Sequence, residues 1–261
     1  MLLENKNAII YGGGGAIGGV VAKAFAREGT RVFLAGRTIE KLNVVARQIS
    51  EAGGFAETAI VDALNKEAVE DYVGEVVEKA GSVNISFNAI SFDDVQGSPL
   101  IKMRCNEFTM PAINALRSYF ITTTAASRYM MRNGSGVILA ITANAGRIPF
   151  ENVGGFGVTC AAIEAFCRQL VVEVGHYGIR VVCLRSAGSP DAPGVDKVFN
   201  QHAQNAGISR REFEDRFAER TMLKLLPKLN EVAVAAVLMV SDKASAITAA
   251  VTNVTCGEIV D

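Results

Sequence analysis

Hydrophobic positions along the chain alternate between short continuous runs and longer stretches with helical spacing. An apolar run at residues 6–11 is followed by a helical pattern over residues 16–28 and by a second apolar run at residues 31–35. Short apolar runs are typical of strands buried on both faces, and apolar residues at i, i+3 and i+4 are typical of helices. The start of the chain therefore predicts a strand–helix–strand unit.

The same alternation continues along the whole chain. It predicts further strands at residues 55–61, 83–88, 136–142, 179–185 and 251–255, and helices at residues 39–52, 66–79, 107–132, 154–176 and 230–241. Strands that alternate with helices form parallel sheets covered on both faces. We therefore predict an α/β fold with a single doubly wound, Rossmann-type parallel sheet of about seven strands. Because no repeat or linker divides it, residues 1–261 are expected to form one domain.

A glycine-rich turn joins the first predicted strand to the first predicted helix. Residues 11–19 read YGGGGAIGG, in which Gly13, Gly15 and Gly18 satisfy the pattern G-x-G-x-x-G. Such glycines permit a tight turn and let backbone N–H groups approach a pyrophosphate at the helix N-terminus. A Walker A loop is excluded, because no Gly-Lys-Ser/Thr follows. A flexible turn is the alternative, but the position after the first strand favours a dinucleotide site.

The net charge and the cysteine content limit the classes of binding partner and the cellular location that the sequence favours. The net charge of −1 gives no electrostatic reason to expect nucleic acid or an anionic membrane as a partner. Residues 1–7 contain no apolar leader, and the longest apolar run, residues 232–240, is too short to span a bilayer. Neither His176 nor His202 has metal-ligand spacing, so no metal site is expected, and both are interpreted as surface residues. The five cysteines are odd in number and include no C-x-x-C pair, which argues against a disulfide framework and favours the reducing cytoplasm. They are Cys105, Cys160, Cys167, Cys183 and Cys256.

The end of the second predicted strand indicates which dinucleotide binds. A ribose 2′-hydroxyl is usually held by Asp or Glu about 20 residues beyond the glycines. This chain has Ala35-Gly36-Arg37 in that region instead. Because an arginine suits a 2′-phosphate, we expect NADP(H) in preference to NAD(H). The alternative for Arg37 is a solvated loop charge.

Several motifs together resemble the short-chain dehydrogenase/reductase family over nearly the whole chain. Gly12 and Gly18 match its T-G-x-x-x-G-x-G pattern, in which Tyr11 replaces Thr and Ala16 replaces the middle Gly. Four further segments match motifs of the family. Val61-Asp62 matches its Asp after strand three, and Asn88-Ala89-Ile90 matches its N-A-G turn. Residues 178–181 match its G-I-R-V entry to strand six, and residues 241–245 match its S-D-x-A-S segment.

That resemblance implies a cofactor site, an assembly and a lid. The residues expected to hold the cofactor are Gly12, Gly14, Gly15, Ile17, Gly18, Arg37, Asp62, Ala63, Asn88 and Ala89. Members of the family are usually homotetramers assembled through their two long helices, which here are residues 107–132 and 154–176. Residues 191–220 correspond to the mobile substrate lid, and the alternative for them is an exposed helical excursion. For Asp62 and Asn88 the alternatives are a helix N-cap and a strand-end turn.

The residues that carry proton transfer in that family are missing. Its Ser, Tyr and Lys positions fall on Ala143, Phe156 and Cys160, and its Asn position falls on or near Ala115. No replacement is near, because residues 103–196 contain no lysine, residues 130–176 no tyrosine and residues 136–185 no serine. General acid catalysis typically supplies roughly 10²–10⁴-fold in rate, so carbonyl reduction by the family mechanism should be badly impaired.

No catalytic residue can be assigned from the remaining candidates. Thr142 carries a hydroxyl beside the missing Ser, with an ordinary β-branched strand residue as the alternative. Cys160 is interpreted as a buried apolar thiol, because no cation is near enough to lower its pKa. Asn144, Arg147 and Glu151 belong to the following loop, where solvated polar side chains are expected.

The sequence therefore supports binding more strongly than turnover. We predict an NADP(H)-binding relative of the family with a degenerate catalytic site, weak or inactive as an oxidoreductase, which binds a small molecule or pairs with an active relative. The alternative is an NADP(H)-dependent oxidoreductase with a non-standard proton donor, acting on a carbonyl or enoyl substrate. A non-redox reaction in the same cleft is a third hypothesis, for which the sequence names no residues.

Overall fold

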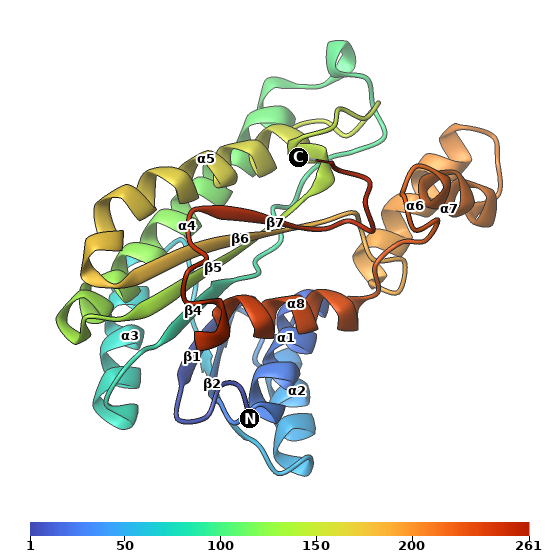
Figure 1. Cartoon of the computed structure of the whole chain (residues 1–261). Coiled ribbons are helices and arrows are strands. Elements are labelled where there is room, and N and C mark those ends of the chain that lie inside the picture. The colour runs from blue at the N-terminus through green and yellow to red at the C-terminus, as the bar shows by residue number, and fades with distance from the viewer. Residues whose placement is uncertain (261) are drawn as a thin grey trace.

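Within residues 1–260, which the computed structural model describes, seven strands pair in parallel in the order β3-β2-β1-β4-β5-β6-β7 (Figure 1). The predicted fold class is therefore confirmed. The strands are β1 Asn7–Tyr11, β2 Arg31–Gly36, β3 Phe55–Ile60, β4 Ile85–Asn88, β5 Gly136–Ala143, β6 Ile179–Ser186 and β7 Ala250–Val254.

Helices cover both faces of this sheet. One core contains the buried side chains of α3, α4 and α5, and the other contains those of α1, α2 and α8. The helices of the two layers are α1 Ala16–Arg27, α2 Ile39–Glu51, α3 Lys66–Ala80, α4 Cys105–Asn133, α5 Phe156–Val174 and α8 Leu229–Val240. Two further helices, α6 Pro193–Asn205 and α7 Arg210–Glu219, stand apart from the layers at the right of Figure 1.

Side-chain alternation explains why the strands read as continuous apolar runs. Ile9 and Tyr11 of β1 belong to the core beneath α3 to α5, whereas Ala8 and Ile10 belong to the core beneath α1, α2 and α8. Successive residues of a strand point to opposite faces, so a strand covered on both sides must be apolar at every position. All five residues of β1 are buried.

Most predicted boundaries lie within two residues of the observed ones, and the differences have local causes. The backbone N–H of Arg104 donates to the Glu107 carboxylate at 3.0 Å, which lets α4 begin at Cys105. The helix-cap alternative for Asp62 is wrong, because Asn65 caps α3 by accepting from the backbone N–H of Ala68 at 3.0 Å. Residues 191–220 contain α6 and α7, which the charged sequence pattern did not resolve as two helices.

The strand order determines where a ligand would lie. β1 is hydrogen-bonded to β2 on one side and to β4 on the other, so the chain reverses its direction of progress across the sheet at β1 and β4. In doubly wound sheets, the loops that follow the strands separate at this switch point and leave a crevice. The predicted cofactor residues follow β1, β2, β3 and β4 and therefore share this edge.

Candidate functional site

The turn after β1 closes through contacts that exclude side chains. Gly12 has a φ of +73°, and a Cβ placed on it would lie 2.7 Å from the carbonyl oxygen of Ala89. A Cβ placed on Gly18 would lie 2.3 Å from the carbonyl oxygen of Gly12. Glycine is therefore required at both positions, because any other residue would push the turn away from α1 or from the loop after β4.

The first turn of α1 is open toward solvent. Gly15 is the N-cap residue, it is exposed together with Ala16, and no side chain of the described residues caps this helix. A Cβ on Gly15 would meet only the Gly12 carbonyl oxygen, at 3.1 Å. The N–H groups at the start of a helix have no intrahelical acceptor and carry a partial positive charge. The turn therefore fits the pyrophosphate of a dinucleotide.

The sheet edge brings the expected cofactor residues together. Gly12, Gly14, Gly15, Ile17 and Gly18 lie in the β1–α1 turn and the first turn of α1, Arg37 follows β2, Asp62 and Ala63 follow β3, Asn88 ends β4 and Ala89 follows it. The backbone N–H of Ala89 donates to the Tyr11 carbonyl at 2.9 Å, which fixes the turn after β4 against the turn after β1.

Asn88 is buried and holds its turn by hydrogen bonds in two directions. Its Nδ2 donates to Thr122 Oγ1 at 3.2 Å and to Ser118 Oγ at 3.4 Å, both on α4. Its Oδ1 accepts from the backbone N–H of Ile90 at 3.1 Å. Asn88 therefore forms the strand-end turn that was its alternative interpretation, and its side chain is committed to the fold.

Arg37 and Asp62 are the exposed polar groups of the set. Asp62 Oδ1 accepts from the backbone N–H of Leu64 at 3.0 Å, and the adjacent Ala63 is buried. The Arg37 side chain is 68% exposed, and its Nη2 lies 4.0 Å from Asp93 Oδ2. Arg37 is therefore free to move toward a phosphate, although one carboxylate already faces it.

Comparison with known proteins places this arrangement in a family. The family model described as Enoyl-(Acyl carrier protein) reductase matches residues 14–258. The chain belongs to the short-chain dehydrogenase/reductase family. The uncharacterized oxidoreductase YxbG of Bacillus subtilis is 26% identical over 250 residues, which cover 94% of this chain and 88% of that protein.

Two solved structures share the fold. The structure of NAD⁺-bound xylitol dehydrogenase superposes with a TM-score of 0.92 at 21% identity and covers 98% of this chain and 100% of its own. A gluconate 5-dehydrogenase from Burkholderia cenocepacia, in complex with NADP and tartrate, has a TM-score of 0.87 at 20% identity and covers 98% and 96% of the two chains. Both bind a nicotinamide dinucleotide.

The positions that the sequence predicts for proton transfer hold apolar groups in the structure. Phe156 begins α5, and its half-buried ring lies 5.9 Å from the ring of Phe92, centroid to centroid. Cys160 is fully buried, and burial raises the pKa of its thiol to about 12. Ala143 ends β5 and is half-buried. These three side chains provide neither a titratable proton near neutral pH nor a cation.

Thr142 is occupied elsewhere, so the structure does not support it as a proton donor. Its hydroxyl is buried on the α5 side of β5 and donates to Glu164 Oε1 at 2.9 Å. Arg185 Nε donates to the same oxygen at 2.9 Å, and Arg185 Nη2 donates to Glu164 Oε2 at 2.7 Å. Both charged side chains are 6% exposed. Thr142 thus serves a buried ion pair.

This Glu164–Arg185 pair was missed by the sequence analysis. A signal was present, because each charge interrupts an apolar stretch, one in α5 and one in β6. Arg185 Nη1 also donates to Asn253 Oδ1 of β7 at 2.9 Å. The paired groups join α5, β5, β6 and β7.

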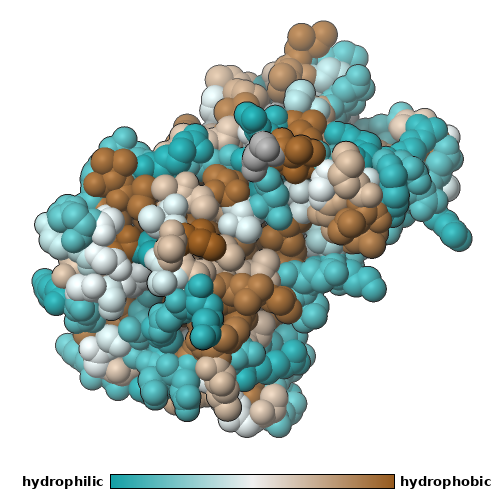
Figure 2. Space-filling model, in the orientation of Figure 1, coloured by the Kyte–Doolittle hydropathy of each residue, from teal (hydrophilic) through white to brown (hydrophobic). Residues whose placement is uncertain are grey.

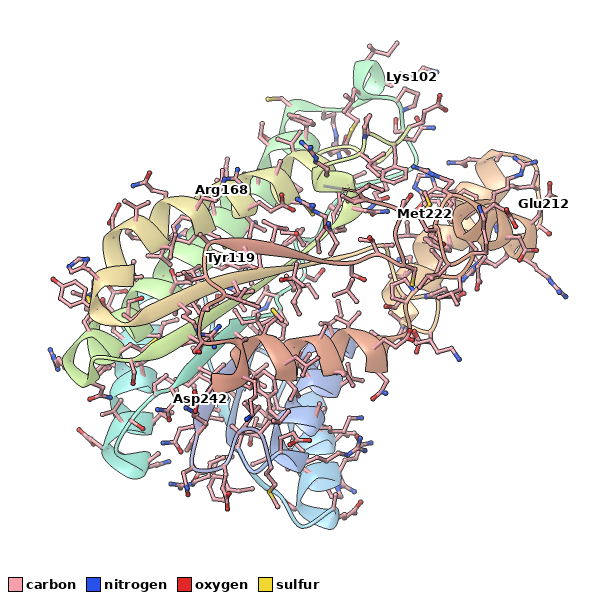
Figure 3. All side chains as sticks on the ribbon, viewed as in Figure 1. Lys102, Tyr119, Arg168, Glu212, Met222 and Asp242 are labelled. Carbon is pink, nitrogen blue, oxygen red and sulfur yellow. The ribbon has the colours of Figure 1, made fainter. Side chains whose placement is uncertain are left out.

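Tyr119 is a buried tyrosine close to the ends of β4 and β5. Figure 3 labels it in the body of the fold, on α4. Its hydroxyl lies 3.0 Å from the carbonyl oxygen of Asn88 and 3.1 Å from that of Ile141. Burial raises its pKa well above the ordinary value. Tyr119 is therefore a structural bridge between β4 and β5. Ala115, one turn earlier, is buried, and the adjacent Asn114 is half-buried.

Asn144 and His202 differ from the expectation that both are solvated. Asn144 is buried, and its Nδ2 donates to Glu258 Oε2 near the C-terminal end. Arg220 Nη2 lies 3.1 Å from the other oxygen of that carboxylate. His202 on α6 is half-buried, with Nε2 3.1 Å from Gln96 Oε1, and burial lowers its pKa. The Arg220–Glu258 and His202–Gln96 contacts fasten the α6–α7 segment to the segment after β7 and to the loop after β4.

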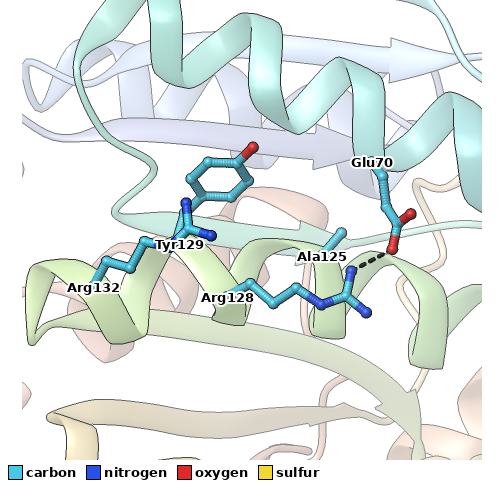
Figure 4. A pocket seen from close by; sticks show the side chains of 5 residues that line it. All are labelled: Glu70, Ala125, Arg128, Tyr129 and Arg132. Atoms are coloured by element: carbon cyan, nitrogen blue, oxygen red, sulfur yellow. Dashed lines mark hydrogen bonds and ion pairs between the residues drawn. The ribbon is translucent and has the colours of Figure 1, made fainter.

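A small surface pocket lies away from this site. It has a volume of about 100 Å³ between α3 and α4, and it is lined by Glu70, Ala125, Arg128, Tyr129 and Arg132 (Figure 4). The Arg128 guanidinium is ion-paired to Glu70 within it. Among residues 1–260, no cluster of three or more His, Cys, Asp or Glu side chains could hold a metal ion, and no helix is long and apolar enough to cross a membrane.

Replacing Glu164 should destabilise the protein strongly. Glu164→Gln leaves the Arg185 cation buried without its counter-ion, and we expect a loss of about 3–5 kcal/mol in the free energy of unfolding. Urea unfolding followed by circular dichroism measures this, since the chain has no tryptophan. The exposed pair Glu212–Arg216 is the control, and Glu212→Gln should cost less than about 1 kcal/mol. Equal losses in the two variants would contradict the role of burial.

Thiol labelling should separate the cysteines by burial. At pH 8 a thiol with a pKa of about 12 is ionised to about one part in 10⁴, so Cys160 should resist alkylation. Cys167 and Cys183 are also buried, whereas Cys105 is exposed. Mass spectrometry after iodoacetamide treatment should find Cys105 modified first and the other three only in denaturant. Because a raised pKa lowers the thiolate fraction, protection should weaken as pH rises.

Proposed function

We propose that this protein binds NADP(H) in the crevice between the β1–α1 turn and the loop after β4, with little or no family-type carbonyl reduction. One observation carries the proposal. The turn that receives the pyrophosphate retains its glycine contacts and its open helix N-terminus, while Phe156 and the buried Cys160 stand where the family has its proton-transfer groups.

The preference for the phosphorylated cofactor rests on Arg37. Its guanidinium follows β2 and is exposed, where a 2′-phosphate on the adenosine ribose would gain a charge-assisted hydrogen bond. The structural relatives include one complex with NADP and one with NAD⁺, which supports a nicotinamide dinucleotide without deciding between the two.

The chemistry of the crevice follows from what its residues hold. When bound, a nicotinamide cofactor supplies hydride. The residues of this chain would bind the pyrophosphate and ribose and shield the ring, but they bring no acid to a carbonyl oxygen. Loss of a positioned general acid corresponds to roughly 3–5.5 kcal/mol of barrier. Orientation alone still accelerates a bound pair, so residual transfer is compatible with this site.

An NADP(H)-dependent oxidoreductase is the second candidate. The relatives of this chain are named as oxidoreductases, dehydrogenases and reductases. A carbonyl or enoyl substrate that carries its own acidic group would supply the missing proton. The α6–α7 segment would then act as a substrate lid, since its contacts with Gln96 and Glu258 join it to the loop after β4 and to the segment after β7. Free cysteines throughout residues 1–260 support a cytoplasmic location.

Binding without turnover is the expected result in solution. Calorimetric titration should show saturable binding of NADPH, tighter than that of NADH. Arg37→Gln should weaken NADPH binding about tenfold, whereas Arg47→Gln, on the exposed face of α2, should leave it unchanged. On the same samples, a panel of ketones, aldehydes, alcohols and enoyl thioesters should leave the absorbance of NADPH constant. Robust turnover would replace this proposal by the oxidoreductase.

Restoring the proton path tests what the site lacks. The variant Ala143→Ser, Phe156→Tyr, Cys160→Lys should gain carbonyl reduction over the wild type while retaining NADPH binding. Circular dichroism would check that it folds, because Cys160 is fully buried. A folded, NADPH-binding variant that gains nothing would show that more than the proton path is missing.

We also propose that the chain assembles with copies of itself through α4 and α5. These helices pack on each other and expose large apolar side chains, with Ile113 53% and Phe120 57% exposed on α4 and Val172 76% on α5. A second apolar surface follows α8, at the centre of the face shown in Figure 2, beside the edge strand β7. Tetramers of the family use such helix pairs, so a second copy is the occupant we assign to α4 and α5.

A charge in the α4–α5 surface should break this assembly. Phe120→Glu would bury a carboxylate in the apolar contact between copies, which is unfavourable. The molar mass of the variant, measured by light scattering, should therefore fall to that of a smaller species. Val44→Glu, on α2 and 48% exposed, is the control and should keep the wild-type mass. Wild-type protein that is monomeric at micromolar concentration would contradict the assembly.

A further inference from the structure

One ion pair crosses the groove in which the adenosine end of a dinucleotide would lie. Arg37 follows β2 directly, and Asp93 belongs to the loop after β4, five residues beyond Asn88. In the sheet, β1 lies between these two strands. The 4.0 Å contact between Arg37 Nη2 and Asp93 Oδ2 therefore spans the C-terminal end of β1, where the glycine turn begins.

The loop that carries Asp93 is anchored on both sides of it. On one side, Phe92 packs against Phe156, with ring centroids 5.9 Å apart. On the other side, the backbone N–H of Gly97 donates to the Asn152 carbonyl at 2.7 Å, and the Gln96 carbonyl accepts from Gln201 Nε2 at 3.0 Å. Asp93 itself has a φ of +52°, in the left-handed region that Asp adopts more readily than most residues other than glycine.

The neighbouring carboxylate has a different partner. Asp94 Oδ2 accepts from Gln96 Nε2 at 2.6 Å. Asp93, in contrast, is 77% exposed and has Arg37 as its ion-pair partner. The two adjacent acids thus carry the same charge in the same loop, and only one of them faces the arginine.

The opposed charges of Arg37 and Asp93 suit the two dinucleotides differently. A 2′-phosphate is attracted by the guanidinium but repelled by a carboxylate within reach of the same group. A ribose 2′-hydroxyl, in contrast, is a donor that a carboxylate accepts, and this is the interaction by which dinucleotide folds commonly select NAD(H). Within this pair, the guanidinium suits the 2′-phosphate of NADP(H), and the carboxylate suits the 2′-hydroxyl of NAD(H).

We propose that Asp93 is a specificity-determining residue, which weakens the preference of Arg37 for NADP(H) and retains affinity for NAD(H). This inference rests on the proposed binding function. It assigns the acidic role to the loop after β4, whereas dinucleotide folds usually place that acid after the second strand. Arg37 would thereby attract the phosphorylated form, and Asp93 would oppose that attraction and shift the ratio of the two affinities toward NAD(H).

Calorimetric titrations of the full chain with NADPH and with NADH test this assignment. Asp93→Asn should tighten NADPH binding by about two- to five-fold, the range that corresponds to an exposed ion pair. The same variant should weaken NADH binding. The two dissociation constants should therefore shift in opposite directions. Asp94→Asn removes the same charge from the same loop and should change neither constant.

Adenosine 2′,5′-bisphosphate and 5′-AMP isolate the adenosine end and should repeat the opposite shifts. The effect on the bisphosphate should shrink at high salt, because exposed charges are screened. Parallel behaviour of Asp93→Asn and Asp94→Asn would overturn the assignment while leaving the proposed function intact. A wild-type protein that binds neither dinucleotide would instead overturn the proposed function.

Discussion

The fold depends on a backbone approach that admits no side chain. Gly18 of α1 packs on the Gly12 carbonyl, and Gly12 in turn packs on the carbonyl of Ala89 after β4. These contacts hold α1, β1 and β4 in one arrangement, and they aim the start of α1 at the crevice. The same closeness that builds the fold thus creates an anion site, so the site cannot be lost without disturbing the sheet. Under the proposed function, this coupling would keep the glycine turn in place whatever residues occupy the predicted catalytic positions.

Much of the architecture could be predicted from the sequence because it depends on local patterns. Buried parallel strands must be apolar throughout, and the glycine turn has a fixed spacing to its helix, so the elements, the fold class and the residues after β1 to β4 follow directly. Contacts between loops leave no comparable local pattern in the sequence. The pairing of Asn144 with Glu258 joins residues 114 positions apart, and the contact of Arg37 with Asp93 joins the segments that follow β2 and β4.

The sequence predicts candidate catalytic positions, but it does not predict the surroundings that the structure gives them. Register between fixed motifs places Ala143, Phe156 and Cys160. The register does not say toward which face of the sheet a neighbouring side chain points, and Thr142 illustrates this. Its position beside Ala143 suggested an available hydroxyl, whereas strand alternation turns it toward α5 and into contact with Glu164. A polar residue next to a functional position therefore needs its face determined before a role is assigned.

The Glu164–Arg185 pair also has a mechanical consequence. Two parallel hydrogen bonds between a carboxylate and a guanidinium tolerate little sliding, so α5 is held at one height above β6. Phe156 lies two turns before Glu164 on the same helix, and its ring is therefore part of a stiff floor. A ligand that enters this crevice must fit that floor as it stands. Adjustment of size or shape would have to come from α6 and α7, which stand apart from the two helical layers and are held by a small separate hydrophobic cluster.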